Sequence, residues 1–134
     1  MNKFKIIELE NFSQENGSLI PIDLLKEIPF EIKRIYFIKD VPTNTMRGGH
    51  AHLIEKEAFF CISGSCVMKI DQNGEGKKKY FLNEPTKVIF VDNNVWHEFE
   101  KFSPGTILVA LSSTEYLPGK KNYLQDYDNF CQQF

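Results

Sequence analysis

Turn signals recur along this chain at short intervals and separate segments that are too short for long helices. Asn16-Gly17, Ser63-Gly64, Asp92-Asn93-Asn94 and Pro104-Gly105 all favour tight turns. The segments between them are rich in β-branched and aromatic residues and lack a sustained helical period. A spacing of about 8–12 residues between turns is typical of β-sandwiches and barrels. The sequence therefore predicts an all-β fold built from antiparallel sheets.

The predicted strands follow from apolar–polar alternation or from short β-branched runs. They are Phe4–Leu9, Ser18–Ile22, Glu31–Lys39, His50–Leu53, Ala58–Ile62, Cys66–Ile70, Lys79–Leu82, Lys87–Val91, Val95–Phe102 and Ile107–Leu111. We expect one helical turn at Asp23–Glu27, and a short helix or a strap over the barrel at Asn122–Phe134. The chain has 134 residues and no repeat or linker, so residues 1–134 fit a single domain.

Composition excludes several classes of protein. The net charge is −2, which gives no reason to expect nucleic-acid binding. No apolar run approaches the ~20 residues of a membrane span, and the N-terminus does not read as a signal peptide. The odd cysteine count, with Cys61 and Cys66 inside apolar runs, suits a reducing cytoplasm. We therefore expect a cytoplasmic protein with no membrane partner.

Histidine is scarce in this chain and lies at suggestive positions. His50 and His52 are two residues apart, so on a strand both imidazoles point to the same face. Arg47 and a Gly-Gly pair precede them, and His97 follows Trp96. Two close imidazoles can serve neighbouring carbons of a small substrate or bind one metal ion. We interpret the cluster as functional, although lone histidines are often structural.

Arginine is also scarce, with only Arg34 and Arg47 against fourteen lysines. A guanidinium fits a phosphate group, or a carbonyl oxygen that gains negative charge, better than an ammonium does. On the predicted strand, Arg34 and Tyr36 share one face while Ile35 and Phe37 share the other. This pattern fits a polar cavity and a solvated outer face equally well.

Two motifs in the chain resemble those of the cupins. The first runs from His50 to Gly64 as His-x-His-x4-Glu-x6-Gly. The second is Asp92-x-Asn94-x2-His97, with Asp and Asn where cupins commonly carry Pro and Gly. Asn tolerates the left-handed conformation that Gly would supply. The resemblance implies a cupin-type double-sheet jelly roll, which agrees with the predicted strands.

More closely, the chain resembles the nucleotide-linked sugar 3,4-ketoisomerases of the cupin superfamily. The resemblance rests on Arg47-Gly48-x-His50-Ala51-His52, Gly64-Ser65-Cys66, Val95-Trp96-His97-Glu98 and Tyr127-Asp128-Asn129-Phe130. It implies conversion of dTDP-4-keto-6-deoxyglucose to the 3-keto isomer, on the way to 3-amino sugars of surface glycans such as lipopolysaccharide. It also implies a homodimer with exchanged N-terminal strands, and neither a metal nor another cofactor.

The resemblance implies that His50 and His52 are the catalytic pair, with Arg47 and Tyr36 in support. The C4 ketone acidifies the C3 hydrogen, and removal of that hydrogen gives an enediolate. Imidazole can take and return a proton near neutral pH. We assign the carbon proton to His52 and the hydroxyl protons to His50. Arg47 and the Tyr36 hydroxyl would stabilise the oxyanion.

We assign substrate binding to Arg34, Trp96 and His97. The partner is expected to be a dTDP-linked keto sugar. The sequence leaves open the C4 configuration of the product and the aromatic residue that stacks on thymine.

Glu57 is the position where the chain departs from this family, because members often carry Gln there. His50, His52, Glu57 and His97 would make a complete shell for a first-row metal. The main alternative is therefore a metal-dependent cupin such as an oxygenase. A sugar-binding cupin without catalysis is a further alternative. A cupin 3,5-epimerase also uses a histidine base, but the Arg-Gly-x-His-Ala-His pattern does not point to it.

Overall fold

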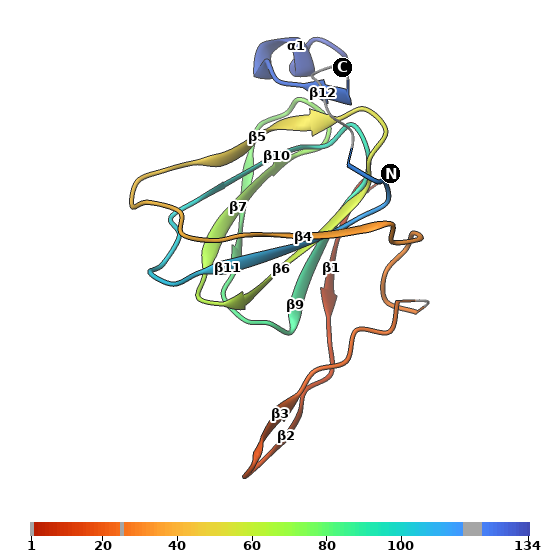
Figure 1. Ribbon diagram of the computed structural model, residues 1–134. Coiled ribbons are helices and arrows are strands. Elements are labelled where there is room, and N and C mark those ends of the chain that lie inside the picture. Colours follow the sequence, from red (N-terminus) through yellow and green to blue (C-terminus); the bar gives the residue numbers. More distant parts are fainter. Residues whose placement is uncertain (1, 25, 117–121) are drawn as a thin grey trace.

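Two five-stranded antiparallel sheets face each other in the computed structural model, which describes residues 2–24, 26–116 and 122–134 (Figure 1). The first sheet has the order β1 (Phe4–Glu8), β9 (Lys87–Val91), β6 (Glu57–Ser63), β11 (Ile107–Ser112) and β4 (Arg34–Ile38). The second has the order β12 (Tyr123–Leu124), β5 (Arg47–His52), β10 (Trp96–Glu100), β7 (Cys66–Asp71) and β8 (Lys78–Leu82). The predicted all-β jelly roll is confirmed.

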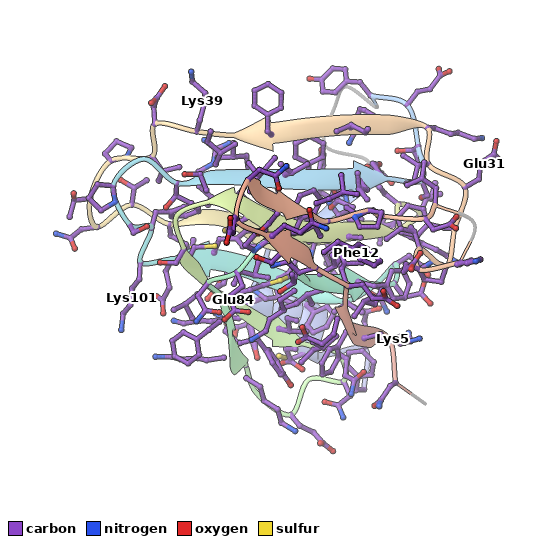
Figure 2. The ribbon with its side chains drawn as sticks, turned by 90° about the horizontal axis from the view of Figure 1, so that it is seen from below. Lys5, Phe12, Glu31, Lys39, Glu84 and Lys101 are labelled. Carbon is purple, nitrogen blue, oxygen red and sulfur yellow. The ribbon has the colours of Figure 1, made fainter. Side chains whose placement is uncertain are left out.

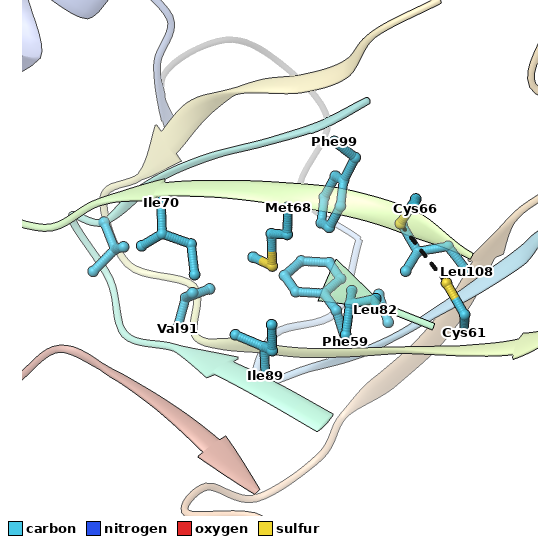
Figure 3. Packing of buried hydrophobic residues seen from close by; sticks show 12 residues of the cluster. Phe59, Cys61, Cys66, Met68, Ile70, Leu82, Ile89, Val91, Phe99 and Leu108 are labelled. Carbon is cyan, nitrogen blue, oxygen red and sulfur yellow. Dashed lines mark hydrogen bonds between the residues drawn. The ribbon is translucent and has the colours of Figure 1, made fainter. Parts of the chain in front are cut away.

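The main core lies between the two sheets, where alternate residues of facing strands point inward. Phe59 on β6, Met68 on β7 and Leu108 on β11 are buried and pack at its centre (Figure 3). Cys61 and Cys66 face each other in the same core with their sulfur atoms 3.7 Å apart, and both are free thiols. They are the small buried hydrophobes that the sequence predicts.

A second apolar cluster covers the outer face of the first sheet. Ile7, Phe60 and Val88 lie on the sheet, and Ile20 and Ile22 from the following segment pack against it. The prediction of a strand over Ser18–Ile22 is therefore wrong in its second half. Alternation of apolar residues there reflects packing onto the sheet rather than pairing within one.

The residues before this segment form a separate hairpin of β2 (Phe12–Gln14) and β3 (Gly17–Leu19), which projects from the sandwich (Figure 1). The sequence does not predict β2, because two of its three residues are polar. Strand β1 pairs with β9 of the same chain and forms the edge of the first sheet. The expected turn at Asp23–Glu27 contains a bond of 2.9 Å from the Glu27 N–H to the Asp23 carbonyl, with Leu25 outside the described residues.

The C-terminal tail forms both expected features, a strap and a short helix. Strand β12 pairs with β5, and α1 (Tyr127–Cys131) follows it. Asp126 caps α1 by accepting a hydrogen bond from the Asn129 N–H at 3.0 Å. Phe130 is fully buried against Ala51 and Trp96, and this contact fixes the tail on the second sheet. Within the described ranges, no helix is long and apolar enough to cross a membrane.

Large apolar side chains are exposed at several places, and two of these are strand β4 and the β2–β3 hairpin. Ile35 and Phe37 point outward from β4 and are 62% and 63% exposed. Phe12 and Leu19 on the β2–β3 hairpin are 53% and 66% exposed, and Phe12 is visible on the hairpin in Figure 2. Exposed apolar groups that gather on one surface commonly mark an interface.

Candidate active site

A cavity of about 390 Å³ is lined by side chains from both sheets. Its volume lies within the roughly 300–1,000 Å³ of small-molecule sites. The lining side chains include Arg34 and Tyr36 from β4, Phe59 from β6, His50 and His52 from β5, and His97 from β10. All three histidines of the chain therefore line one cavity.

The pairing between β5 and β10 is irregular beside the cavity. The register shifts between His97 and Glu98, opposite Gly48 and Gly49, which both have a φ of 79°. A Cβ atom on Gly48 would lie 3.1 Å from the His97 carbonyl oxygen, so the close approach of the two strands favours glycine. Irregularities of this kind commonly redirect side chains near active sites.

The alternation along β5 brings the two histidines together as the sequence predicts. His50 Nε2 lies 3.2 Å from His52 Nε2, and the ring centroids are 4.6 Å apart. The His97 ring lies 5.0 Å from that of His50 and 5.4 Å from that of His52. Its Nδ1–H donates to the Val95 carbonyl at 3.1 Å, which fixes the ring. Three imidazoles thus share one wall.

Two buried carboxylates lie behind His52, one at each ring nitrogen. Glu57 Oε1 lies 2.6 Å from His52 Nε2 and 3.6 Å from His97 Nε2. Glu55 Oε1 lies 3.7 Å from His52 Nδ1, and Glu55 Oε2 accepts from Arg34 at 2.9 Å. Glu57 also accepts a hydrogen bond from the Tyr36 hydroxyl. No motif in the sequence indicates Glu55.

These surroundings shift the pKa values of four groups in different directions: those of His50 and Glu57 are lowered, and those of Glu55 and Tyr36 are raised. Burial, together with His97 and His52, lowers the pKa of His50 to about 3, so His50 is neutral at pH 7. Burial opposes ionisation of Glu57, but hydrogen bonds from His52 and His97 outweigh it and hold its pKa well below the ordinary value. Burial and the Glu57 charge raise the pKa of Glu55 and that of Tyr36. Such separation is typical of acid–base sites.

The two arginines differ in their surroundings. Arg34 forms an ion pair with Glu55, and its guanidinium lies 5.2 Å from the centre of the Tyr36 ring. Arg47 is exposed and lines the cavity from the other side. Arg34 and Tyr36 face the cavity while Ile35 and Phe37 face outward, so the polar-cavity interpretation of this strand is correct.

Trp96 does not line the cavity, contrary to its predicted role in substrate binding. Alternation along β10 points His97 inward and places Trp96 on the other face of the sheet. There its ring contacts Tyr127 and Phe130, at centroid distances of 5.1 and 5.8 Å. Trp96 therefore anchors the C-terminal helix. Asn94 behaves as predicted, with a φ of 57° in the turn before β10.

Two tyrosines of the C-terminal region line the cavity but are not predicted from the sequence. Tyr123 pairs with His52 across β12 and β5, and its ring centroid lies 4.9 Å from those of His50 and His52. Tyr116 is 73% exposed and lies at the opening. No local pattern signals either residue. The position of Tyr123 depends on pairing with His52 on a strand about 70 residues earlier, and Tyr116 lies with its ring centre 5.9 Å from the Arg34 guanidinium.

Metal binding can be judged from the ligand atoms. Among the described residues, His50, His52 and His97 form one candidate set, and His52, Glu55 and Glu57 form another. In each set the ligand atoms lie within 4.8 Å of one another. Neither set contains all four residues of the metal shell considered in the sequence. The histidine set nevertheless has the donor chemistry that zinc or iron accepts.

Comparison with known proteins identifies the family. The family model described as "FdtA: WxcM-like, C-terminal" matches residues 2–134. The chain belongs to the FdtA family. A family relative, TDP-4-oxo-6-deoxy-α-D-glucose-3,4-oxoisomerase of Aneurinibacillus thermoaerophilus, is 35% identical over 126 residues, which are 94% of this chain and 88% of that protein.

Solved structures agree with the family assignment. A 3,4-ketoisomerase from Helicobacter canadensis is 38% identical with a TM-score of 0.88, covering 97% of this chain and 96% of that one. The 3,4-ketoisomerase QdtA from Thermoanaerobacterium thermosaccharolyticum is similar with a TM-score of 0.90 and 27% identity, covering 99% and 94%. That structure is of a variant in complex with TDP-4-keto-6-deoxyglucose. The predicted family is confirmed.

Proposed function

We propose that this chain is a nucleotide-sugar 3,4-ketoisomerase that converts dTDP-4-keto-6-deoxyglucose to its 3-keto isomer. Family membership supports this activity, and a solved relative binds that sugar. The observation that carries the proposal is a neutral imidazole, His50, facing a cavity of about 390 Å³ and in contact with a second imidazole, His52.

The sequence assigns the carbon proton to His52, but the geometry favours His50. Both ring nitrogens of His52 face carboxylates, Glu57 at 2.6 Å and Glu55 at 3.7 Å. His50 is neutral and more exposed, so it can accept a proton from C3 and return it to C4. His52, which lies between the two carboxylates, contacts His50 at 3.2 Å and helps to hold its ring in place.

The remaining cationic and aromatic groups support binding of the nucleotide. Arg47 has no ion-pair partner within the described ranges and lies exposed beside the cavity, so we assign it to the diphosphate. Tyr116 and Tyr123 at the same opening are candidates for stacking on thymine. Arg34, held by Glu55, lies beside Tyr36 where it supports an oxyanion on the sugar.

The decisive experiment is incubation with dTDP-4-keto-6-deoxyglucose followed by NMR of the product, with and without a chelator. We expect the 3-keto isomer in both samples, and the spectrum also gives the C4 configuration. In D₂O, deuterium should appear at C4 unless His50 carries the same proton across without exchange. Recovery of unchanged substrate would contradict the proposal. Turnover lost to the chelator would favour a metal-dependent cupin that uses the histidine set.

We also propose that the chain acts as a homodimer. The exposed Phe12 and Leu19 of the projecting hairpin and the exposed Ile35 and Phe37 of β4 support this. The free edge of β1 fits an exchange of N-terminal strands between subunits. A cytoplasmic location, and supply of 3-amino sugars for surface glycans, remain predictions of the same proposal.

A further inference from the structure

Glu55 is a buried acid in the connection between β5 and β6. It is 2% exposed and does not line the cavity. A carboxylate is rarely buried to this degree unless it is paired. Its Oε2 accepts a hydrogen bond from the Arg34 guanidinium at 2.9 Å, and its Oε1 accepts one from the Thr114 hydroxyl at 3.1 Å. Glu55 therefore joins the start of β4 to the segment that follows β11.

Backbone hydrogen bonds fix the connection that carries Glu55. The Lys56 N–H donates to the Ser113 hydroxyl at 2.8 Å, and the Ser113 N–H donates to the Lys56 carbonyl at 3.0 Å. Next to β4, the Lys33 N–H donates to the Ser112 carbonyl at 2.8 Å. Glu55 and the first residue of β4 are thus held against the same end of β11.

Arg34 reaches the cavity from this fixed base. Its side chain is 19% exposed and lines the cavity. Within the described part of the chain, Glu55 is the one carboxylate that forms an ion pair with it. The guanidinium lies 5.2 Å from the centre of the Tyr36 ring and 5.9 Å from that of the Tyr116 ring. A guanidinium carries five N–H donors in a planar fork, so the contact with Glu55 leaves others for a ligand in the cavity.

The position of these remaining donors depends on Glu55. An arginine side chain has many rotamers, and a fixed anion at one edge of the guanidinium selects among them. When the C3 proton leaves the sugar, an oxygen of the enediolate gains negative charge. Donors stabilise such a charge well only if they already lie where it develops. A displaced guanidinium would therefore lower the rate of reaction more than the affinity for substrate.

We propose, on the basis of the isomerase activity proposed above, that Glu55 is a positioning residue that holds the Arg34 guanidinium where its free N–H groups stabilise the oxygen that becomes negative. Glu55 neither touches the substrate nor exchanges a proton in this role. It acts through Arg34, although its Oε1 also lies 3.7 Å from His52 Nδ1. A double variant separates these two routes.

Steady-state kinetics of Glu55→Gln, Arg34→Ala and the double variant would make this separation. Glutamine keeps the shape and one acceptor oxygen but removes the charge. We expect kcat to fall by about 10- to 100-fold in Glu55→Gln with KM little changed, because misplacing a catalytic group by about 1 Å can cost about 10²-fold. The double variant should be no slower than Arg34→Ala. Losses that multiply would show that Glu55 acts through His52, and would overturn the inference.

Chemical rescue gives a readout that a merely structural role would not move. In Arg34→Ala, guanidinium ion added at a non-denaturing concentration can occupy the space of the lost group, beside Glu55 and the Tyr36 ring. We expect the ion to restore part of kcat in Arg34→Ala, and to restore less when Glu55→Gln is also present. Urea is the chemical control, because it has a similar planar shape but no charge.

Glu98→Gln is the matched control variant. Glu98 is also buried and ion-paired, to Lys77 at 3.2 Å, but it does not line the cavity. Glu98→Gln alone should match the wild type in kcat. Combined with Arg34→Ala, it should leave the rescue by guanidinium as large as in Arg34→Ala alone.

Equal rescue with and without Glu55, no rescue of Arg34→Ala, or a wild-type kcat in Glu55→Gln would each overturn the inference while leaving the isomerase intact. An inactive wild-type protein would instead overturn the proposed function, and this role of Glu55 with it. If Glu55→Gln does not fold, Thr114→Val replaces it, because valine removes only the hydrogen bond to Oε1. An unchanged kcat in Thr114→Val would then count against the inference.

Discussion

His50 and His52 lie two residues apart on one strand, yet they have different surroundings. His50 contacts other aromatic rings on the cavity side, whereas His52 has a carboxylate at each ring nitrogen. The identical side chains are therefore suited to different tasks. A neutral imidazole can act as a base at once, whereas one paired with carboxylates is suited to donate and to orient.

We expect His50→Asn to lose the carbon-proton transfer, because asparagine keeps some hydrogen bonding but offers no usable base. General acid–base catalysis is worth about 10²–10⁴-fold, so kcat should fall at least that far with dTDP binding unchanged. In His52→Asn, kcat should fall less than in His50→Asn. Steady-state kinetics and calorimetric titration with dTDP would test both variants. A larger loss of kcat in His52→Asn than in His50→Asn would assign the carbon-proton transfer to His52. If both variants remain active, the catalytic assignment is contradicted.

The pKa of His50 also predicts how stability depends on pH. It is about 3 in the folded chain, against about 6.5 for ordinary histidine. Below pH 6.5 His50 binds a proton in the unfolded chain but stays neutral in the folded chain. The free energy of unfolding therefore decreases as the pH falls from 6.5 towards 3. Urea unfolding at pH 7 and pH 5 should therefore show a larger drop for the wild type than for His50→Asn. Equal drops would contradict this.

The sequence predicts these residues unevenly. The strand period of two indicates that His50 and His52 share a face, and their neighbourhood identifies Arg47. The cupin motif already groups Glu57 with the histidines, but no pattern reveals that Glu55 also lies beside His52, since that depends on how β5 and β6 meet. The strand period also cannot place Trp96 on the outer face, because the direction of β10 relative to the cavity is a tertiary property.

At the scale of elements, the C-terminal strap determines part of the cavity. Strand β12 places Tyr123 beside the histidines, and α1 holds β12 through the buried Phe130. The Tyr127 hydroxyl donates to Asp71 at the end of β7, and Lys77 lies 4.3 Å from the centre of the Tyr127 ring. The strap is thus fixed to the second sheet at several points.

We expect Phe130→Ala to loosen this strap. Truncating a buried Phe typically costs about 3–5 kcal/mol, although relaxation at a chain terminus reduces the loss. Movement of Tyr123 should raise KM more than it lowers kcat, because His50 stays on β5. Gln133→Ala on the same tail is the control. Thermal unfolding and steady-state kinetics would test this, and an unchanged KM in Phe130→Ala would show that the strap does not shape the binding site.

Strand prediction succeeds where alternation has a single cause. Lys87–Val91 is predicted residue for residue, and Cys66–Ile70 is one residue short of β7. The prediction fails at Ile20 and Ile22, whose spacing reflects packing on a sheet from outside. It also misses β2, because a hairpin that packs against little else needs no apolar face.

At the scale of the whole molecule, large apolar side chains are exposed to solvent. We expect the chain to be a dimer at micromolar concentration, as the hairpin and the outer face of β4 each expose large side chains. Light scattering should give twice the mass of one chain. Phe12→Ser with Leu19→Ser should shift the mass towards one chain if the hairpin forms the contact. A wild-type mass equal to one chain would contradict the prediction.

Metal content is a further property of the whole molecule. If the three histidines act as proton-transfer and binding groups, the protein needs no metal. Purification without added ions should therefore give far less than one equivalent of iron, manganese or zinc by elemental analysis. Stoichiometric metal, with activity lost to a chelator and restored by the ion, would instead support the metal-dependent alternative.

The active-site side chains are divided between the two sheets, with Tyr36 and Glu57 on the first and His50, His52 and His97 on the second. Separation of the sheets would therefore dismantle the site at the same moment as the core. Residual turnover after heating should report the fraction of molecules still folded. A simple enzyme assay could then screen libraries for stabilised variants without any spectroscopic probe.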